Sequence, residues 1–335
     1  MVGLSGWAYY NKHVIAGSIA GAQTDYQKKV IVHYGSGADS GENVYCNNHC
    51  KTDFGDLRII LADSTHLDIH IESQVNSDYA IVWFEVDAIP ADPDTKTIYV
   101  CYGKADATTT SNGTNTFLLF DDFSSDTTGN YTKAGTVTYD AVNDWVVLGL
   151  DTEVVEQSRS RMFQGNFSNY AARAKVNFVG TYHAPYSQGG ISVCKSGTTS
   201  GYEGCIIDGT LIANKLRMTE DEATELASVA FTATRSVWYR MEFACMASVQ
   251  KYKNWLATNS EPAAYDLSAT DASKNAGGAG FFAYSKQIYC DELAVRKYVD
   301  PEPAHGAWSG ETARIKGSSL PSTMMTLLNN KIFFS

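Results

Sequence analysis

The loop at residues 180–188 concentrates side chains that suit sugar binding. Sugar sites combine exposed aromatic rings with a few polar groups, and this loop offers both kinds close together. Further rings along the chain could join the loop on one rim, although each ring alone is also what a core would use. The predicted glycan-binding residues are Tyr182, His183, Tyr186, Gln188, Tyr202, Trp255 and Tyr284.

Acidic residues at two distant places suggest a bound cation. The segments 116–124 and 289–298 each set an acidic pair against alternating apolar residues. We interpret them as the first and last strands of one sandwich, lying side by side. Calcium needs several oxygen ligands, so these strands could hold a structural calcium ion. The alternative is that the acidic pairs are merely solvated at strand ends. The predicted calcium ligands are Asp121, Asp122, Asp126 and Asp291.

The composition of the chain excludes several classes of partner. A length of 335 residues favours two domains. A formal net charge of −11 leaves no general positive field for phosphates, so nucleic acid is not an expected partner. No apolar run approaches the roughly 20 residues that span a bilayer, so we expect no membrane insertion. With 19% charged residues and 20 tyrosines, the composition is typical of strand-rich, externally displayed proteins.

Residues 1–114 are predicted to form a first domain built from short strands. Apolar runs of about five residues alternate with turn residues, which predicts an antiparallel β-sandwich rather than a parallel sheet with helices. The polar segment 105–114 is too rich in Thr, Ser, Asn and Gly for a strand and is predicted to be a linker.

Several motifs of this first segment resemble a known family. They are Cys-Lys-Thr-Asp-Phe-Gly-Asp-Leu-Arg at 50–58, the strand at 80–86 and Thr-Ile-Tyr-Val-Cys-Tyr-Gly at 97–103. Their succession is similar to a prokaryotic domain of unknown function, numbered two-three-four-one, which recurs in archaeal and bacterial surface proteins. The resemblance covers nearly all of residues 5–105. It implies a surface location and leaves the role of the domain open.

The Asp-Phe-Gly-Asp-Leu-Arg core of this resemblance is predicted to be a tight turn. Phe54 would fill the core, and Arg58 would form an ion pair with one of the two aspartates. The alternative is that Asp53 and Asp56 ligate a cation. No glycine-rich phosphate loop or catalytic-loop sequence accompanies the motif, so a kinase is excluded.

Residues 115–305 resemble a concanavalin A-like, laminin-G-type jelly roll. The motifs are Phe-Asp-Asp-Phe at 120–123, Gly-Tyr at 201–202, Trp-Tyr-Arg-Met-Glu-Phe at 238–243 and Cys-Asp-Glu-Leu-Ala-Val-Arg at 290–296. The resemblance implies an all-β fold class for the whole chain, an N-terminal β-sandwich followed by a jelly-roll sandwich. Such folds include lectins, carbohydrate-binding modules, adhesins and glycosidases, so the fold alone does not give the activity.

The acidic residues do not follow the pattern of a glycosidase of this fold. Retaining glycosidases set two carboxyl groups about 5–5.5 Å apart, in an acid-x-acid-x-x-acid pattern on one strand. Glu153 and Glu156 have a different spacing, and Asp291 and Glu292 are expected to point to opposite faces of a strand. A lyase would need a tyrosine with a histidine or arginine in one cleft, for which residues 182–183 are the only adjacent pair. We therefore expect no enzyme activity and no catalytic residues.

Seven cysteines leave at least one without a partner in the chain. Cys46 and Cys50 are close enough to bridge a loop, and Cys194 and Cys205 flank a glycine-rich turn as hairpin partners would. The alternative is buried free thiols in strands. Metal-site spacing of the two-residue kind is absent, so zinc is not expected.

Prolines at 301 and 303 are predicted to end the sandwich. The segment 306–335 is then an apolar tail, which would fold back on the chain or dock on a neighbouring subunit. Its docking residues are predicted to be Leu320, Met324, Leu327, Leu328, Ile332, Phe333 and Phe334.

These observations favour a non-enzymatic structural or adhesion protein with a lectin-like domain. The amino end has neither a basic region nor an uninterrupted apolar region, so no signal peptide is predicted. This makes a virion component, a capsid decoration or tail, a natural candidate, beside a cell-surface or extracellular assembly component. The expected partners are other subunits of an assembly and a glycan or host surface. The alternatives are a secreted polysaccharide-active enzyme, a hydrolase or lyase, and a free carbohydrate-binding module.

Overall fold

The computed structural model describes residues 6–150, 159–179, 186–209 and 214–314. Nearly all regular structure in them is strand, which confirms the predicted all-β class. None of the helices in these ranges is long and apolar enough to span a membrane. The chain divides into two compact units. Unit 1 comprises Met1–Thr24, Lys28–Asn112 and Pro303–Ser335, and unit 2 comprises Asp25–Gln27 and Gly113–Glu302.

In its described part, unit 1 is built from two four-stranded sheets. Its strands are β1 (Tyr9–Ala16), β2 (Gln23–His33), β3 (Asn43–Tyr45), β4 (Arg58–Ile60), β5 (Ile69–Val75), β6 (Tyr79–Ile89), β7 (Thr95–Tyr102) and β23 (His305–Ala313). The sheets run in the orders β23-β1-β7-β4 and β3-β2-β6-β5. β2 and β3 pair in parallel, whereas β1 pairs antiparallel with both of its neighbours.

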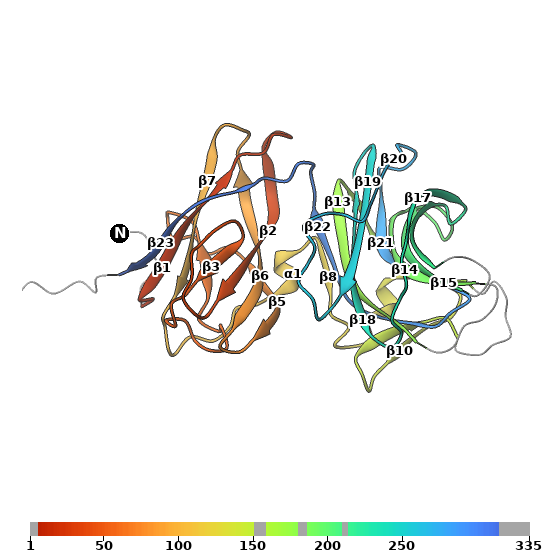
Figure 1. Ribbon diagram of the computed structural model, residues 1–335, viewed down its shortest axis with the longest axis horizontal. Coiled ribbons are helices and arrows are strands. Elements are labelled where there is room, and N and C mark those ends of the chain that lie inside the picture. The colour runs from red at the N-terminus through yellow and green to blue at the C-terminus, as the bar shows by residue number, and fades with distance from the viewer. Residues whose placement is uncertain (1–5, 151–158, 180–185, 210–213, 315–335) are drawn as a thin grey trace, which may run out of the picture. The chain divides into compact units, whose positions relative to one another are not determined.

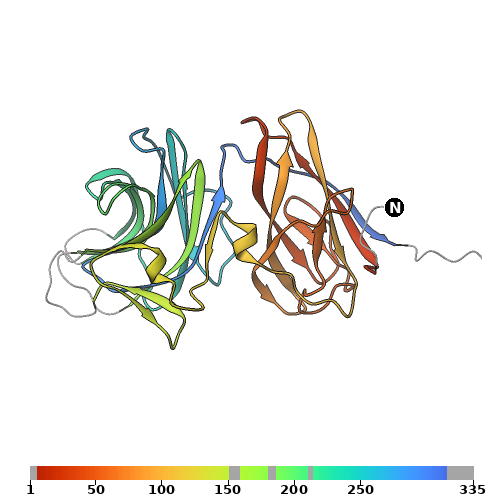
Figure 2. The same cartoon turned by 180° about the vertical axis from the view of Figure 1, so that it is seen from behind.

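Strand β23 shows that the first part of the predicted tail folds back on the chain, which is one of the two predicted alternatives. It runs beside β1, with Tyr9 opposite Ala313 and Ile15 opposite His305. Figures 1 and 2 show this blue strand along the red first strand of the chain. Residues 305–313 are therefore part of the first sheet and are not a free docking segment. The predicted docking residues from Leu320 to Phe334 lie outside the described ranges.

The Asp-Phe-Gly-Asp-Leu-Arg turn of unit 1 is organised by a buried carboxylate. Phe54 is fully buried, as predicted. Asp56 is also fully buried and accepts hydrogen bonds from the backbone N–H groups of Lys51, Gly103 and Lys104. The guanidinium of Arg58 donates to backbone carbonyls, including that of Leu57 at 2.6 Å, and not to the aspartates as we had predicted.

Unit 2 is a sandwich of two larger sheets. Its strands are β8 (Leu119–Asp121), β9 (Thr132–Ala134), β10 (Val137–Asp140), β11 (Trp145–Leu148), β12 (Arg159–Ser168), β13 (Tyr170–Phe178), β14 (Tyr186–Lys195), β15 (Tyr202–Gly209), β16 (Lys215–Glu220), β17 (Thr224–Ala230), β18 (Trp238–Cys245), β19 (Val249–Leu256), β20 (Leu267–Thr270), β21 (Ala276–Tyr284) and β22 (Ile288–Lys297). A short helix, α1 (Gly113–Thr116), and a 3₁₀ turn, η1 (Thr128–Asn130), complete the unit.

The eight-stranded sheet runs β10-β11-β22-β13-β18-β19-β20, with β8 also paired to β22. The seven-stranded sheet runs β17-β16-β15-β14-β21-β12-β9. Side chains from both sheets form one apolar core, among them Phe243 and Phe281. The predicted pairing of the first and last strands is confirmed, because β8 lies antiparallel to β22 with Asp121 opposite Leu293.

The core of unit 2 contains a disulfide that differs from the expected pair. Cys194 is bonded to Cys245, which joins β14 of one sheet to β18 of the other. Cys205 is a buried free thiol, as are Cys46 and Cys50. The predicted hairpin pairing of Cys194 with Cys205 is therefore wrong, because those strands carry the two side chains to opposite faces of their sheet.

Candidate functional site

One face of the eight-stranded sheet carries aromatic rings that the core does not use. In four neighbouring strands the alternating pattern sends Val146, Val176, Tyr239 and Ile288 into the core of unit 2. The residue next to each of them must point to the other face, because successive side chains in a strand alternate. Those residues are Trp145 in β11, Asn177 in β13, Trp238 in β18 and Tyr289 in β22.

The three rings of this set pack together, and we call Trp145, Trp238 and Tyr289 the aromatic face. Trp145 stacks on Tyr289 with ring centroids 4.9 Å apart and an interplanar angle of 16°. Trp238 lies 5.4 Å from Trp145 and is tilted by 60°. All three rings are half-buried, so each keeps part of its surface in contact with solvent. Clustered, partly exposed rings are unusual on a sheet surface without a partner.

Asn177 lies between two of these rings. It pairs in register with Trp238 on one side and with Tyr289 on the other. Its side chain is 7% exposed, and its Oδ1 atom has no hydrogen-bond partner among the described residues. The same holds for the buried Nε1 of Trp145. An acceptor and a donor thus remain unpaired beside the rings, and such buried polar groups call for a water or a ligand.

A charged row borders the aromatic face. Lys175 stands opposite Asp291 on β22 and opposite Arg240 on β18. Its ammonium group forms an ion pair with Glu292. The carboxylate of Glu292 also accepts a contact from Arg240 Nη2 at 3.0 Å. Both cations of this row are therefore engaged by one carboxylate.

A β-bulge corrects the expected orientation of the acidic pair on β22. The register of β13 with β22 shifts between Arg173 and Lys175, and Glu292 has a φ of 50°. As a result Lys175 contacts both carboxylates, with its Nζ atom 3.9 Å from Asp291 Oδ2. Asp291 and Glu292 therefore lie on the same face, because a bulge inserts one extra residue and re-aims the side chains.

The carboxyl group of Asp291 is electrostatically distinct. Burial, together with the neighbouring Glu292 carboxylate, raises its pKa to about 6 in spite of the lowering effect of Lys175. Its Oδ1 atom accepts the backbone N–H of Glu292 at 2.8 Å. The pKa shift shows that the environment of this carboxyl group favours its neutral form more than water does.

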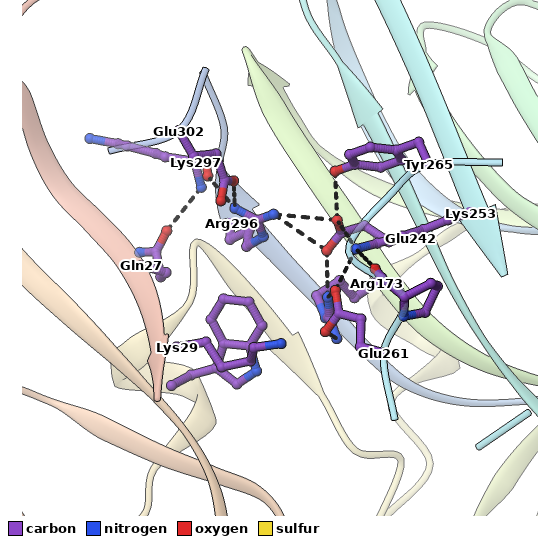
Figure 3. Close-up of polar contacts among 12 residues, drawn as sticks. Gln27, Lys29, Arg173, Glu242, Lys253, Glu261, Tyr265, Arg296, Lys297 and Glu302 are labelled. Carbon is purple, nitrogen blue, oxygen red and sulfur yellow. Dashed lines mark hydrogen bonds and ion pairs between the residues drawn. The ribbon is translucent and has the colours of Figure 1, made fainter. Parts of the chain in front are cut away.

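Further along the same face, the charged side chains form a closed network (Figure 3). Glu242 is contacted by Arg173 Nη1, by Arg296 Nη2 at 3.3 Å and by Lys253 Nζ at 3.6 Å. Tyr265 donates its hydroxyl hydrogen to Glu242 at 2.7 Å. Burial alone would raise the pKa of Glu242, but the three cations outweigh it and lower that pKa. This network has its charges satisfied internally and is structural.

Trp255, one of the predicted glycan residues, lies in this closed part. Arg173 and Lys253 sit over its ring, at 5.4 Å and 5.6 Å from the ring centre. The ring is 8% exposed. It is therefore packed beneath the ion network and offers no surface for a sugar.

The other predicted glycan residues do not form an exposed rim in the described part. Tyr202 is fully buried and donates to Asp271 Oδ1 at 2.6 Å. Gln188 and Tyr284 are also buried. The remaining predicted residues are not described: Tyr182 and His183 lie outside the described ranges, and only the backbone of Tyr186 is placed, in β14.

The predicted calcium ligands are occupied by their own neighbours. Asp121 Oδ2 accepts hydrogen bonds from Tyr131 and Thr127, at 2.8 and 2.7 Å. Asp122 and Asp126 each accept bonds from a residue two positions further along the chain. No group of three or more metal-ligating side chains occurs in the ranges that the structure describes. Structural calcium stays a prediction.

The aromatic face was missed by sequence analysis for a definable reason. Each of the three rings lies in a segment with a strand-like pattern, directly beside a residue of the core. The alternation of Trp238 with Tyr239 and of Tyr289 with Cys290 signals an outward ring. The rings come together only because β11, β22, β13 and β18 are neighbours in the sheet. The local sequence of each strand does not indicate which strands it pairs with.

Comparison with solved structures gives several that this chain is similar to. The carbohydrate binding module CBM66 from Bacillus subtilis has 10% identity and a TM-score of 0.38, covering 50% of this chain and 96% of that chain. A protein of unknown function with a galectin-like fold, also from Bacillus subtilis, has 12% identity and a TM-score of 0.38, covering 54% and 96%. Lectin II from Ulex europaeus has 7% identity and a TM-score of 0.40, covering 54% and 98%. These values concern the fold alone.

Comparison with protein families gives one match, and comparison with curated proteins gives none. The family is described as a domain of unknown function, DUF2341. The matched region begins in the turn before β4 and ends at Trp145, the first residue of β11. The chain thus carries a DUF2341 domain at residues 53–145.

Proposed function

We propose that unit 2 binds carbohydrate through the aromatic face and does not turn it over. The observation that carries this proposal is the packing of three half-exposed rings around Asn177, whose side-chain oxygen has no partner among the described residues. The apolar C–H face of a sugar packs on aromatic rings, while its hydroxyl groups need donors and acceptors at the edge. Rings with a few convergent polar groups meet both needs.

Burial of the ring surfaces against a sugar would contribute binding free energy of the size expected for a moderate affinity. Each 100 Å² of apolar surface removed from water contributes about 2.5 kcal/mol. Hydrogen bonds to the polar edge add about 1 kcal/mol each. Part of this gain offsets the lost freedom of the ligand. The lectins and the carbohydrate binding module named above belong to a similar fold, but the proposal rests on the rings of this chain.

A polysaccharide-active enzyme is the competing function, and one observation favours it. The bulge turns Asp291 and Glu292 to the same face, beside the aromatic face. Glu292 is already engaged by Lys175 and Arg240, which leaves it poorly placed as a nucleophile or base. Incubating the full chain with polysaccharides and measuring released sugars separates the two functions. Reducing ends that accumulate with time would replace the binding proposal by the enzymatic one.

The binding test compares matched variants of the full chain on a glycan array and by titration calorimetry. Tyr289→Ala removes a ring, whereas Tyr289→Phe keeps it and removes only the hydroxyl. Trp238→Ala and Trp238→Phe form a second pair. We expect the alanine variants to lose binding by tenfold or more and the phenylalanine variants to retain most of it. Equal binding by both members of each pair would rule out the aromatic face.

The external location and assembly role are part of the same proposal. A binding module of this kind serves a virion or cell-surface component that attaches to glycan, with other subunits as partners. Analytical ultracentrifugation of the full chain, and of one that ends at Arg314, tests the assembly role. If both sediment as monomers, the segment after residue 314 does not assemble the chain.

A further inference from the structure

We infer that the ligand of the aromatic face is a neutral glycan, oriented by a hydrogen bond from one of its hydroxyl groups to Asp291. This inference rests on the proposed function and deepens it. Asp291 follows Tyr289 by two positions on β22, and their partners on β13 are Lys175 and Asn177. Regular alternation therefore sets the carboxylate on the same face as the ring, about 7 Å further along the strand.

The hydrogen bonds of Asp291 leave one oxygen available. Oδ1 accepts the N–H of Glu292. Oδ2 lies 3.9 Å from Lys175 Nζ, which is beyond hydrogen-bond distance, and has no other partner among the described residues. The side chain is 20% exposed, so a ligand can reach it. A carboxylate oxygen that accepts no hydrogen bond, beside stacked rings, can accept one from a hydroxyl group.

A second polar group points to the same place independently. Asn177 stands opposite Tyr289 and Trp238 in the neighbouring strands, and its side chain is 93% buried, with an Oδ1 atom that has no partner among the described residues. Its Oδ1 atom is a second acceptor for a hydroxyl donor. Two acceptors beside three rings match a ligand whose edge carries several O–H groups.

The charges of the row explain why the ligand is neutral. Lys175 and Arg240 both contact Glu292, and Lys175 also lies 3.9 Å from Asp291 Oδ2, so two carboxylates balance the two cations and leave no excess positive charge for an acidic sugar. A uronate would bring its carboxylate toward Asp291, where like charges repel. The hydroxyl groups of a neutral hexose or pentose meet no such cost.

The β-bulge at Glu292 places the side chains of Asp291 and Glu292 on the same face of the sheet. In a regular strand Asp291 and Glu292 would face opposite sides. Glu292 has a positive φ and forms the closer ion pair with Lys175, whereas Asp291 Oδ2 keeps only the longer contact of 3.9 Å with that ammonium group.

The experiment measures the affinity of the full chain for cellohexaose, mannohexaose, xylohexaose and polygalacturonate by calorimetry. Variant Asp291→Asn removes the charge at constant shape. Variant Asp122→Asn is the matched control, because Asp122 is an exposed carboxylate that raises the pKa of Asp291 through its charge but lies outside the sheet face. We expect D291N to lower the affinity for the best neutral ligand about tenfold. The variant should also discriminate less between that ligand and the other neutral oligosaccharides. D122N should change neither.

The outcomes separate this inference from the proposed function. If the alanine variants of the aromatic face lose binding while D291N binds within twofold of wild type, the role of Asp291 is wrong and the proposed function stands. If the alanine variants bind normally, both fail. Equal weakening by D291N and D122N would show a field effect and overturn the contact. Tight binding of polygalacturonate would overturn the neutral class. Should D291N unfold, Asp291→Glu, which displaces the carboxylate by one methylene, takes its place with the same expected loss of preference.

Discussion

His13 Nε2 lies 2.9 Å from His305 Nδ1, so a hydrogen bond joins the first strand of unit 1 to β23. The ring of His13 also stacks on Trp308 at 3.8 Å. One nitrogen of the pair must be an unprotonated acceptor, so the contact requires at least one neutral ring. The pairing of β1 with β23 is therefore sensitive to protons.

We expect unit 1 to lose stability as the pH falls below about 6.5. Burial lowers the pKa of His13 to about 4, with the charge of Lys28 adding to the effect against a backbone hydrogen bond to Ala307. Burial, Lys28, His13 and Lys29 also lower the pKa of His305. In this window the unfolded chain binds protons that the folded chain does not, so stability falls by up to roughly 1.4 kcal/mol per pH unit for each histidine.

The measurement is urea unfolding between pH 7.5 and 4.5, followed by tryptophan fluorescence. A matched variant, His13→Gln with His305→Gln, should flatten the slope. His66→Gln, which removes a histidine that is not part of this pair, should keep it. A wild-type slope indistinguishable from that of the double variant would exclude the histidine pair as its source.

Replacing Glu242 by Gln should destabilise unit 2 by about 3–5 kcal/mol. The substitution leaves three buried cations, Arg173, Arg296 and Lys253, with only the two carboxylates of Glu261 and Glu302. One buried positive charge is then uncompensated, which is costly. The control is Glu225→Gln, because the 37% exposed Glu225 pairs with Lys215 on the surface. That change should cost less than about 1 kcal/mol. Thermal unfolding by calorimetry compares them, and similar losses for both would show that the network is not a structural centre.

The carboxylate of Asp56 should matter far more than that of Asp53. Asp56→Ala removes the acceptor of three partly buried backbone N–H groups, and each buried group left unsatisfied costs about 1–3 kcal/mol. Asp53 is half exposed and accepts one backbone bond, from Gly55. We expect Asp53→Ala to cost less than about 1 kcal/mol. Denaturant titration of both variants checks the ranking, which the reverse order of midpoints would refute.

Loss of the disulfide should lower the stability of unit 2 by roughly 4 kcal/mol. Cys194 and Cys245 are 51 positions apart, and closing a loop of that length removes entropy from the unfolded chain. The double variant Cys194→Ala with Cys245→Ala tests this by calorimetry. Mass spectrometry after alkylation without reductant should show two fewer free thiols than cysteines. Seven alkylated cysteines would show that the bond does not form.

Much of the fold follows from local patterns. The short alternating runs predict the strands. The two segments that carry an acidic pair beside an apolar run, at 121–122 and 291–292, are correctly predicted to be neighbouring strands. Phe54 is predicted in the core because it is an apolar ring within an otherwise polar turn. The structure confirms that it is buried.

What could not be predicted depends on pairing between distant residues. The partnership of β1 with β23 links residues about 300 positions apart, and nothing in either segment encodes the other. The partner of Cys194 depends on which strands face each other across the sandwich. The aromatic face needs four strands in register, and the bulge at Glu292 reverses the orientation that simple alternation gives to its carboxylate.

The return of β23 to β1 also sets an order of events during synthesis. The segment that completes unit 1 leaves the ribosome after every strand of unit 2 has been made. Unit 2 can therefore fold before the edge strand β23 has been added to the first sheet. A released chain that ends before residue 305 would contain every strand of unit 2 but would lack the edge strand of the first sheet, which would leave β1 open to chaperones and proteases.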